Sequence, residues 1–376
     1  MRKSVVDFRA PDRWPVLNFV MLHPVVGLQG RERPAMGALN SILMSRQHIA
    51  ANAGCRALVT FVLCLAAIRV CGAEPIPPGA EVPPAWAYPV NPPDFKPAVE
   101  DGSLRHVPGS TRAYTLGQLR DFFMAPDWHP GDHPVMPGVV AVGRRPDVYA
   151  CGFCHRADGR GGPENASIAG LPAAYIVQQM ADFKSGARKS SVPSRLPVAT
   201  MASLSMAASA AEIDSAAAYF SALRPAANIT VVETAVVPKS YVTGWHLAAF
   251  PGSEREPTGQ RIIEVPENLE HFVSRDARAV FIAYVPIDSV ERGRALVAGG
   301  GGRTVACASC HGPDLRGLGA VPPLAGRSPT YLVRQLYDFK HGARAGSGSI
   351  LMKPVVEQLE IEDMVSIAAY AASLPP

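Results

Sequence analysis

The feature that most limits the possible folds of this chain is a duplicated block containing a Cys-x-x-Cys-His motif. The motif occurs as Cys151-Gly-Phe-Cys154-His155 and again as Cys307-Ala-Ser-Cys310-His311, in a register of 156 residues. In the same register, Tyr, Gln and the sequence Asp-Phe-Lys-x-Gly-Ala-Arg recur over 175–188 and 331–344. A match of this length without a gap indicates that one structural unit has been duplicated.

Each motif predicts the covalent attachment of one haem c, so we expect two haem c groups and their irons. On a helical turn, residues three and four apart share a face, so both sulfurs can bond the porphyrin while the imidazole faces the iron. The attachment residues would be Cys151, Cys154, Cys307 and Cys310, and the proximal iron ligands would be His155 and His311.

Two other uses of these cysteines are compatible with part of the motif. A redox dithiol or an all-cysteine zinc site also contains Cys-x-x-Cys, but neither requires His directly after the second Cys. The two pairs are also much further apart than the roughly 15 to 20 residues of a zinc ribbon. Haem attachment is therefore the favoured interpretation.

The repeat also indicates the distal iron ligands. Beyond the block the register becomes 151, and there Met201 aligns with Met352, whereas Met206 would align with Glu357. Both aligned methionines precede the last predicted helix of their repeat. We predict Met201 and Met352 as the distal ligands, with ordinary packing of a flexible apolar side chain as the alternative.

Helical periodicity predicts the surrounding elements. Apolar spacing favours a helix over 175–185, followed by Gly186 as a C-terminal cap. A capping box at Ser209-Ala-Ala-Glu212 predicts the start of the closing helix, whose copy should run from about 360 to 374. We expect the segments that carry the methionines to be loops. A helix over 289–298 should precede the second motif, while 139–146 lacks a good amphipathic pattern.

The N-terminal part of the chain resembles a secretory leader. An apolar run over 57–68 follows Arg46 and Arg56 and ends at Cys71-Gly-Ala73, which predicts a signal peptide cleaved after Ala73 and a periplasmic protein. An uncleaved anchor is the alternative. The leader would span 1–73, of which 1–43 fits a start-site overcall, and it contains the other three cysteines, Cys55, Cys64 and Cys71.

Removal of the leader reverses the charge balance. The whole chain has 36 Lys and Arg against 32 Asp and Glu, but residues 1–73 contain nine of the former and three of the latter. The mature chain then has 27 against 29, a formal charge of −2. The apparent basicity belongs to the leader, so nucleic acid is not an expected partner.

The predicted fold class is mainly α, with two tandem haem-binding domains over 137–224 and 287–376. A Pro-rich arm over 74–136 would wrap the first domain, and a small strand-containing insertion over 225–286 would separate the two. In the arm, His129 and His133 could suggest a metal site, although a surface loop is favoured. The β-like runs of the insertion lie at 230–232, 261–265 and 279–285.

The two repeats resemble the class I cytochromes c, in particular the dihaem cytochrome c4 group. The resemblance covers 137–224 and 287–376 and rests on the haem motif, the Leu324-Ala-Gly326 segment, the Tyr-x-x-x-Gln helix and the position of the methionine. One departure concerns the carbonyl that accepts from the proximal histidine. Repeat two has the family's proline, Pro322, whereas repeat one has Ala166, which puts that contact in doubt.

The resemblance implies an electron-transfer protein and not an enzyme. It would relay single electrons in a respiratory chain, from a periplasmic dehydrogenase to a terminal oxidase or another cytochrome, and membrane association would come through a partner. Two alternatives stay open. One is a dihaem peroxidase, which would need an iron with a displaceable ligand. The other is an obligate cytochrome subunit of a dehydrogenase complex, which the long insertion and the arm make plausible.

Overall fold

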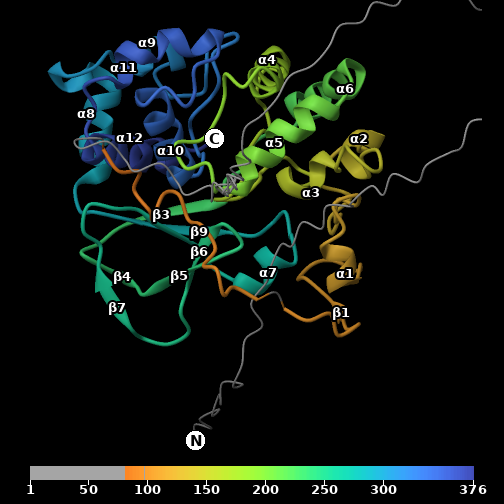
Figure 1. Ribbon diagram of the computed structural model, residues 1–376. Coiled ribbons are helices and arrows are strands. Elements are labelled where there is room, and N and C mark those ends of the chain that lie inside the picture. Colours follow the sequence, from red (N-terminus) through yellow and green to blue (C-terminus); the bar gives the residue numbers. More distant parts are fainter. Residues whose placement is uncertain (1–80, 97) are drawn as a thin grey trace, which may run out of the picture. The chain divides into compact units, whose positions relative to one another are not determined.

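The computed structural model describes residues 81–96 and 98–376. The predicted leader, its cleavage after Ala73 and the cysteines at positions 55, 64 and 71 lie outside the described residues. Within the described part, no helix is both long and apolar enough to cross a membrane. The described residues form a mainly helical protein with several small sheets (Figure 1).

The first repeat is built from helices that flank its Cys-x-x-Cys-His motif. They are α2 (Gly138–Ala141), α3 (Cys151–His155), α4 (Ala173–Lys184), α5 (Leu196–Ala207) and α6 (Ala210–Ala222). The motif forms the helical turn α3, as predicted. Gly186 follows α4 with a left-handed φ of 74°, and Ser209 and Glu212 form the predicted capping box of α6.

The second repeat has the same order of helices around its own motif. They are α8 (Ser289–Gly299), η1 (Gly300–Gly302), α9 (Ala308–His311), α10 (Pro329–Lys340), η2 (Ser347–Leu351), α11 (Lys353–Val356) and α12 (Ile361–Ser373). Helices α8 and α12 cross so closely that a Cβ at Gly293 would overlap the carbonyl of Ser366. The predicted helices over 289–298 and 360–374 are therefore confirmed, and their contact forms much of the core of this repeat.

The segments that carry the methionines differ from the prediction. In repeat one the predicted loop is wrong, because Met201 lies inside the twelve-residue helix α5. Pro197 fits the first turn of that helix, and the Ala, Leu and Met residues that follow are good helix formers. In repeat two, Met352 lies between two short helical turns, η2 and α11.

The insertion contains most of the strands, and all three β-like runs are confirmed. The elements are β3 (Ile229–Glu233), β4 (Val236–Pro238), β5 (Ser240–Thr243), β6 (His246–Ala249), β7 (Arg255–Pro257), β8 (Ile263–Pro266), α7 (Leu269–Val273) and β9 (Phe281–Val285). β9 lies in the middle of a three-stranded sheet, parallel to β3 and antiparallel to β8. The pairs β4–β7 and β5–β6 form two further antiparallel ladders.

The Pro-rich arm contains little regular structure: β1 (Leu104–Arg105), β2 (Tyr114–Thr115) and α1 (Leu116–Leu119). The expectation that it wraps the first haem domain is too narrow. Ala87 and Tyr88 are buried in the core of the second repeat, and the Tyr88 hydroxyl donates to Asp338 Oδ1 at 2.8 Å. Further along the arm, Trp128 Nε1 donates to the carbonyl of Ser274 in the insertion at 2.7 Å. The arm thus contacts both the second repeat and the insertion. In each contact an aromatic ring is buried while its polar atom makes a hydrogen bond.

Candidate haem-binding motifs

The four motif cysteines lie at the helical turns α3 and α9, with Cys307 as the N-cap residue of α9, and none of them forms a disulfide. Burial raises the pKa of the Cys151 thiol to about 12 and that of the Cys307 thiol to about 11. This direction argues against a redox dithiol, which needs a lowered pKa. Among residues 81–96 and 98–376, no three His, Cys, Asp or Glu side chains converge on a metal-binding point.

Each motif histidine is oriented by one backbone carbonyl. Nδ1 of His155 lies 2.8 Å from the carbonyl oxygen of Ala166, and Nδ1 of His311 lies 2.8 Å from that of Pro322. In both cases the acceptor is eleven residues beyond the histidine. A carbonyl accepts from an N–H, so the proton is on Nδ1 and Nε2 is left as the nitrogen that can bind iron.

The doubt raised by Ala166 is thereby resolved. The contact is made by a main-chain oxygen, so the side chain of that residue does not decide whether it forms. In both repeats a tight turn brings the carbonyl to the ring, with Gly161 and Gly317 in left-handed conformations of 64° and 81°. A Cβ on either glycine would overlap the returning backbone, which explains why both copies keep glycine at this point.

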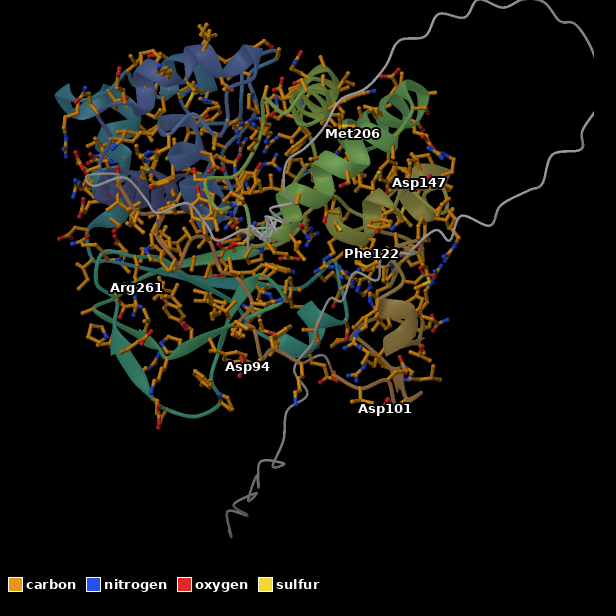
Figure 2. The ribbon with its side chains drawn as sticks, in the orientation of Figure 1. Asp94, Asp101, Phe122, Asp147, Met206 and Arg261 are labelled. Carbon is orange, nitrogen blue, oxygen red and sulfur yellow. The ribbon has the colours of Figure 1, made fainter. Side chains whose placement is uncertain are left out.

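The two predicted distal methionines are both partly buried. Met352 packs against the core of the second repeat, and Met201 lies on α5. Met206, on the same helix, is 67% exposed and is labelled in Figure 2. Ligation by Met201 and Met352 stays a prediction.

The repeated Tyr, Gln and Arg side chains meet one another between the two repeats. Arg188 donates to Gln179 of its own repeat at 2.8 Å and, across the boundary, to Tyr331 and Gln335 at 3.0 Å each. Burial alone would raise the pKa of Tyr331, but the neighbouring guanidiniums, Arg188 first, lower it below the usual value. We call this set of hydrogen bonds between the repeats the ladder. Each repeat contributes the same Tyr, Gln and Arg to it, which explains why these residue types recur in both copies.

The mirror contacts complete this ladder. Arg344 donates to Gln335 of its own repeat at 3.0 Å, and to Tyr175 and Gln179 of the other repeat at 2.7 and 2.8 Å. The backbones join as well. The N–H of Lys189 donates to the carbonyl of Ala343, and the N–H of Ala345 donates to that of Ala187, both at 2.7 Å.

The first motif is covered by the arm. The N–H of Ala150 donates to the carbonyl of Phe122 at 2.8 Å, and the rings of Phe122 and Phe153 have centroids 4.7 Å apart; Phe122 is labelled in Figure 2. A Cβ at Gly152 would crowd Ala125, so the glycine allows the arm to approach. The second motif has Ala308 and Ser309 at the corresponding positions and exposes Cys310.

The insertion also reaches the first motif. Arg275 is buried, and its Nη1 donates to the carbonyl of Phe153 while its Nε donates to that of Leu119, both at 2.9 Å. Its Cζ lies 3.6 Å from the centroid of the Phe153 ring. Burial, followed by the charge of Arg156, lowers the pKa of Arg275 to about 9, so the guanidinium keeps its charge at neutral pH.

The histidines of the arm have ordinary partners. Nε2 of His129 lies 3.0 Å from Asp276, and Nε2 of His133 lies 3.2 Å from Asp127. The oxygen of Tyr219 lies 3.2 Å from Nδ1 of His133. These contacts favour the structural interpretation of the arm's histidines over a metal site.

Sequence reasoning missed both arginines that surround the first motif. Arg156 directly follows His155, and Arg275 lies in the insertion over 225–286, for which the sequence predicts only strands. A signal for Arg156 was present, because the repeat pairs it with Gly312 and an arginine in place of a left-handed glycine is unusual. No sequence pattern places Arg275 beside Phe153, since that contact depends on the tertiary fold.

No protein-family model matches the chain. A thiosulfate dehydrogenase electron acceptor of Stutzerimonas stutzeri is 27% identical over 62% of this chain and 82% of its own length. Cytochrome c4 of Pseudomonas aeruginosa is 26% identical over 63% of this chain and 89% of its own length. Cytochrome c-554(548) of Halomonas halodenitrificans is 41% identical over 18% of this chain and 82% of its own length.

With these relatives, the duplicated helical unit and its paired Cys-x-x-Cys-His turns define a class of redox protein. The chain belongs to the c-type cytochromes, as a dihaem, cytochrome c4-like member with two tandem class I domains. It therefore carries two covalently bound haem c groups and functions in electron transfer.

Proposed function

We propose that the protein is a periplasmic carrier that accepts single electrons from a dehydrogenase and passes them to a terminal oxidase or another cytochrome. The observation that carries the proposal is the matched geometry of the two motifs. In each, a histidine on the motif's helical turn has its Nδ1 fixed by a carbonyl at 2.8 Å, which leaves Nε2 as the nitrogen that would bind the haem iron.

In this proposal the protein's own residues determine how each haem is held. Cys151 and Cys154 would tether the first haem and Cys307 and Cys310 the second, with Met201 and Met352 as distal ligands. A haem iron bound between histidine and methionine supplies one-electron chemistry at a relatively high potential. The carbonyls that accept from Nδ1 keep each imidazole in one orientation and increase its basicity.

The donor is proposed from the relatives. Two of the similar proteins, in Stutzerimonas stutzeri and Thiomonas intermedia, are named thiosulfate dehydrogenase electron acceptors. A dehydrogenase that oxidises a small sulfur oxyanion is therefore the first donor to test. The domain limits of 137–224 and 287–376 and export to the periplasm after cleavage at Ala73 belong to the same proposal.

The ligand assignment is tested by visible spectroscopy of the oxidised protein. We expect the weak red charge-transfer band of methionine-ligated iron, with an intensity equivalent to two haems. Met201→Leu and Met352→Leu should each remove half of the band, and the matched control Met206→Leu should leave it unchanged. High-spin iron in either haem of the intact protein would contradict the carrier role and support a peroxidase.

The donor assignment is tested by rapid mixing. Oxidised protein is combined with a purified thiosulfate dehydrogenase and thiosulfate, and haem reduction is followed at the α-band. Reduction of both haems supports the proposal. A protein that is reduced by dithionite but not by this system would contradict a sulfur-oxyanion dehydrogenase as the donor.

A further inference from the structure

The two haem motifs differ in the charge that the fold places against them. At the first motif, Arg156 and Arg275 are 3% and 7% exposed, so both guanidiniums are removed from bulk water. At the second motif, the residue that corresponds to Arg156 is Gly312, and Ser309 replaces the phenylalanine on which Arg275 stacks. The second motif therefore serves as a reference within the same chain, because it lacks the charges of Arg156 and Arg275.

Both arginines occupy backbone positions that favour glycine. Arg156 has a φ of 69° and Arg275 a φ of 59°, whereas Gly312 has a φ of 83°. An L-residue other than glycine is sterically strained in the left-handed region. The fold accepts this strain twice at the first motif, where a glycine would be free of it.

The environment of Arg156 is poor in compensating groups. Its Nη2 reaches the carbonyl of Phe272 at 3.4 Å, its Cζ lies 5.2 Å from the Phe272 ring, and Glu164 is 3.9 Å away. Its Nη1 is buried and has no hydrogen-bond partner in the described part of the chain. Asp158 and Asp276 also act on Arg156, but each already has a partner, Arg160 at 2.7 Å and His129 at 3.0 Å, so the two buried guanidiniums are only partly neutralised.

Both guanidiniums belong to residues that adjoin the first motif itself. Arg156 directly follows His155, and Nη1 of Arg275 donates to the carbonyl of Phe153 inside the motif at 2.9 Å, while its Cζ lies 3.6 Å from the centroid of the Phe153 ring. Two buried positive charges are therefore placed at the first motif.

We propose that Arg156 and Arg275 raise the reduction potential of the haem at the first motif. Oxidation of the iron adds one positive charge, and two cations in a buried site disfavour that added charge. The residues act through the field at the motif and are positioning residues, not ligands. The insertion that supplies Arg275 thus tunes the first haem. The inference rests on the proposed attachment of a haem at Cys151 and Cys154.

The test is a spectroelectrochemical titration of the full-length holoprotein. Arg156→Gly reproduces the second motif and relieves the left-handed strain, so folding is favoured at the same time as the charge is removed. We expect the reduction equilibrium of the first haem to shift toward the oxidised form on the order of tenfold, which is 59 mV for a one-electron couple. The second haem should keep its potential.

Four further variants separate charge from packing. Arg275→Gln should lower the first potential, and Arg275→Lys should restore most of it because the charge returns. Glu164→Gln should raise it, since a negative charge is removed. Arg278→Gln removes a surface arginine that pairs with Asp132 at 2.7 Å and should have no effect. The two redox components are assigned in a Met352→His background, where the second potential falls.

The outcomes distinguish this proposal from the one on which it rests. A haem count of one, by pyridine haemochrome, would show that the first motif carries no haem and would overturn the attachment itself. Two haems with an unchanged first potential in both Arg156→Gly and Arg275→Gln would overturn the electrostatic role alone. Equal shifts in Arg275→Lys and Arg275→Gln would assign the effect to packing and would also overturn it.

Discussion

The guanidinium of Arg344 donates a 2.7 Å hydrogen bond to the hydroxyl of Tyr175, which belongs to the other repeat. The reciprocal bond joins Arg188 to Tyr331 at 3.0 Å. Residues that recur in both copies of a duplicated chain are commonly assigned to the core of each copy. Here they recur because the two copies bind each other through the same side chains.

Removal of one tyrosine hydroxyl should weaken this boundary. We expect Tyr175→Phe to lower the free energy of unfolding by about 1 kcal/mol, because Arg344 keeps its bonds to Gln179 and Gln335. Denaturant titration measures the loss. The matched control is Tyr241→Phe, since the Tyr241 ring packs on Phe250 in the insertion. A loss as large in the control would show that the boundary bond is not responsible.

The crossing of α8 and α12 predicts a large effect of a single methyl group. Gly293→Ala places a Cβ against the carbonyl of Ser366, and we expect a destabilisation of about 3 kcal/mol. Gly138→Ala is the control, because no atom lies within 4 Å of a Cβ at that position in α2. Thermal unfolding monitored by circular dichroism compares the two. Equal stability of both variants would contradict the close crossing.

A second glycine, Gly152, tests how closely the arm packs on the first motif. Gly152→Ala should push Ala125 and the arm away from α3, at a cost of about 1 to 3 kcal/mol. The second motif already has alanine at the corresponding position, Ala308, so Ala308→Gly should not loosen any cover. Limited proteolysis of the arm reports the difference. An arm cleaved at the same rate in Gly152→Ala and the parent protein would refute the prediction.

The capping box of α6 predicts a pH dependence in acid. Hydrogen bonds from Arg144 and from Ser209 lower the pKa of Glu212 to about 2. A lowered pKa means that the stabilisation is present above the usual value of 4.5 and is lost as the pH falls toward about 2. We expect Glu212→Gln to melt below the parent protein near about pH 6, and the two melting temperatures to converge at about pH 2.

The size of this effect should also depend on salt. The pair of Arg144 and Glu212 is 2.8 Å long and lies at the surface, where ions screen it. Added salt should therefore reduce the difference between Glu212→Gln and the parent protein at neutral pH. A difference that persists unchanged into acid and high salt would assign the stability to helix packing instead.

The repeat explains why so much of the helical fold was predictable. The helix over 175–185 was located by its apolar spacing and by Gly186, and the helix over 360–374 was located as the copy of the helix that the capping box at Ser209 begins. The methionine-bearing segment of repeat one was mistaken for a loop. Its apolar residues do not form one face, and periodicity fails for a helix that is apolar on several sides.

The candidate site was predictable to the extent that it is local in sequence. The motif turns follow from the spacing of the cysteines and the histidine, and the carbonyl of Pro322 was expected from the resemblance to the class I cytochromes c. The contact of Arg275 with Phe153 could not be predicted in this way. It joins residues 122 positions apart and depends on how the insertion folds. The ladder between the repeats was visible as recurrence, but its partners were not.

The burial of Tyr88 in the second repeat has a consequence for the order of folding. Its hydroxyl donates to the carbonyl of Arg334 and to Asp338 Oδ1, which are 246 and 250 residues away along the chain. Contacts between residues so far apart in sequence close a large loop and form slowly. We therefore expect the contact of Tyr88 with the second repeat to be among the later ones to form.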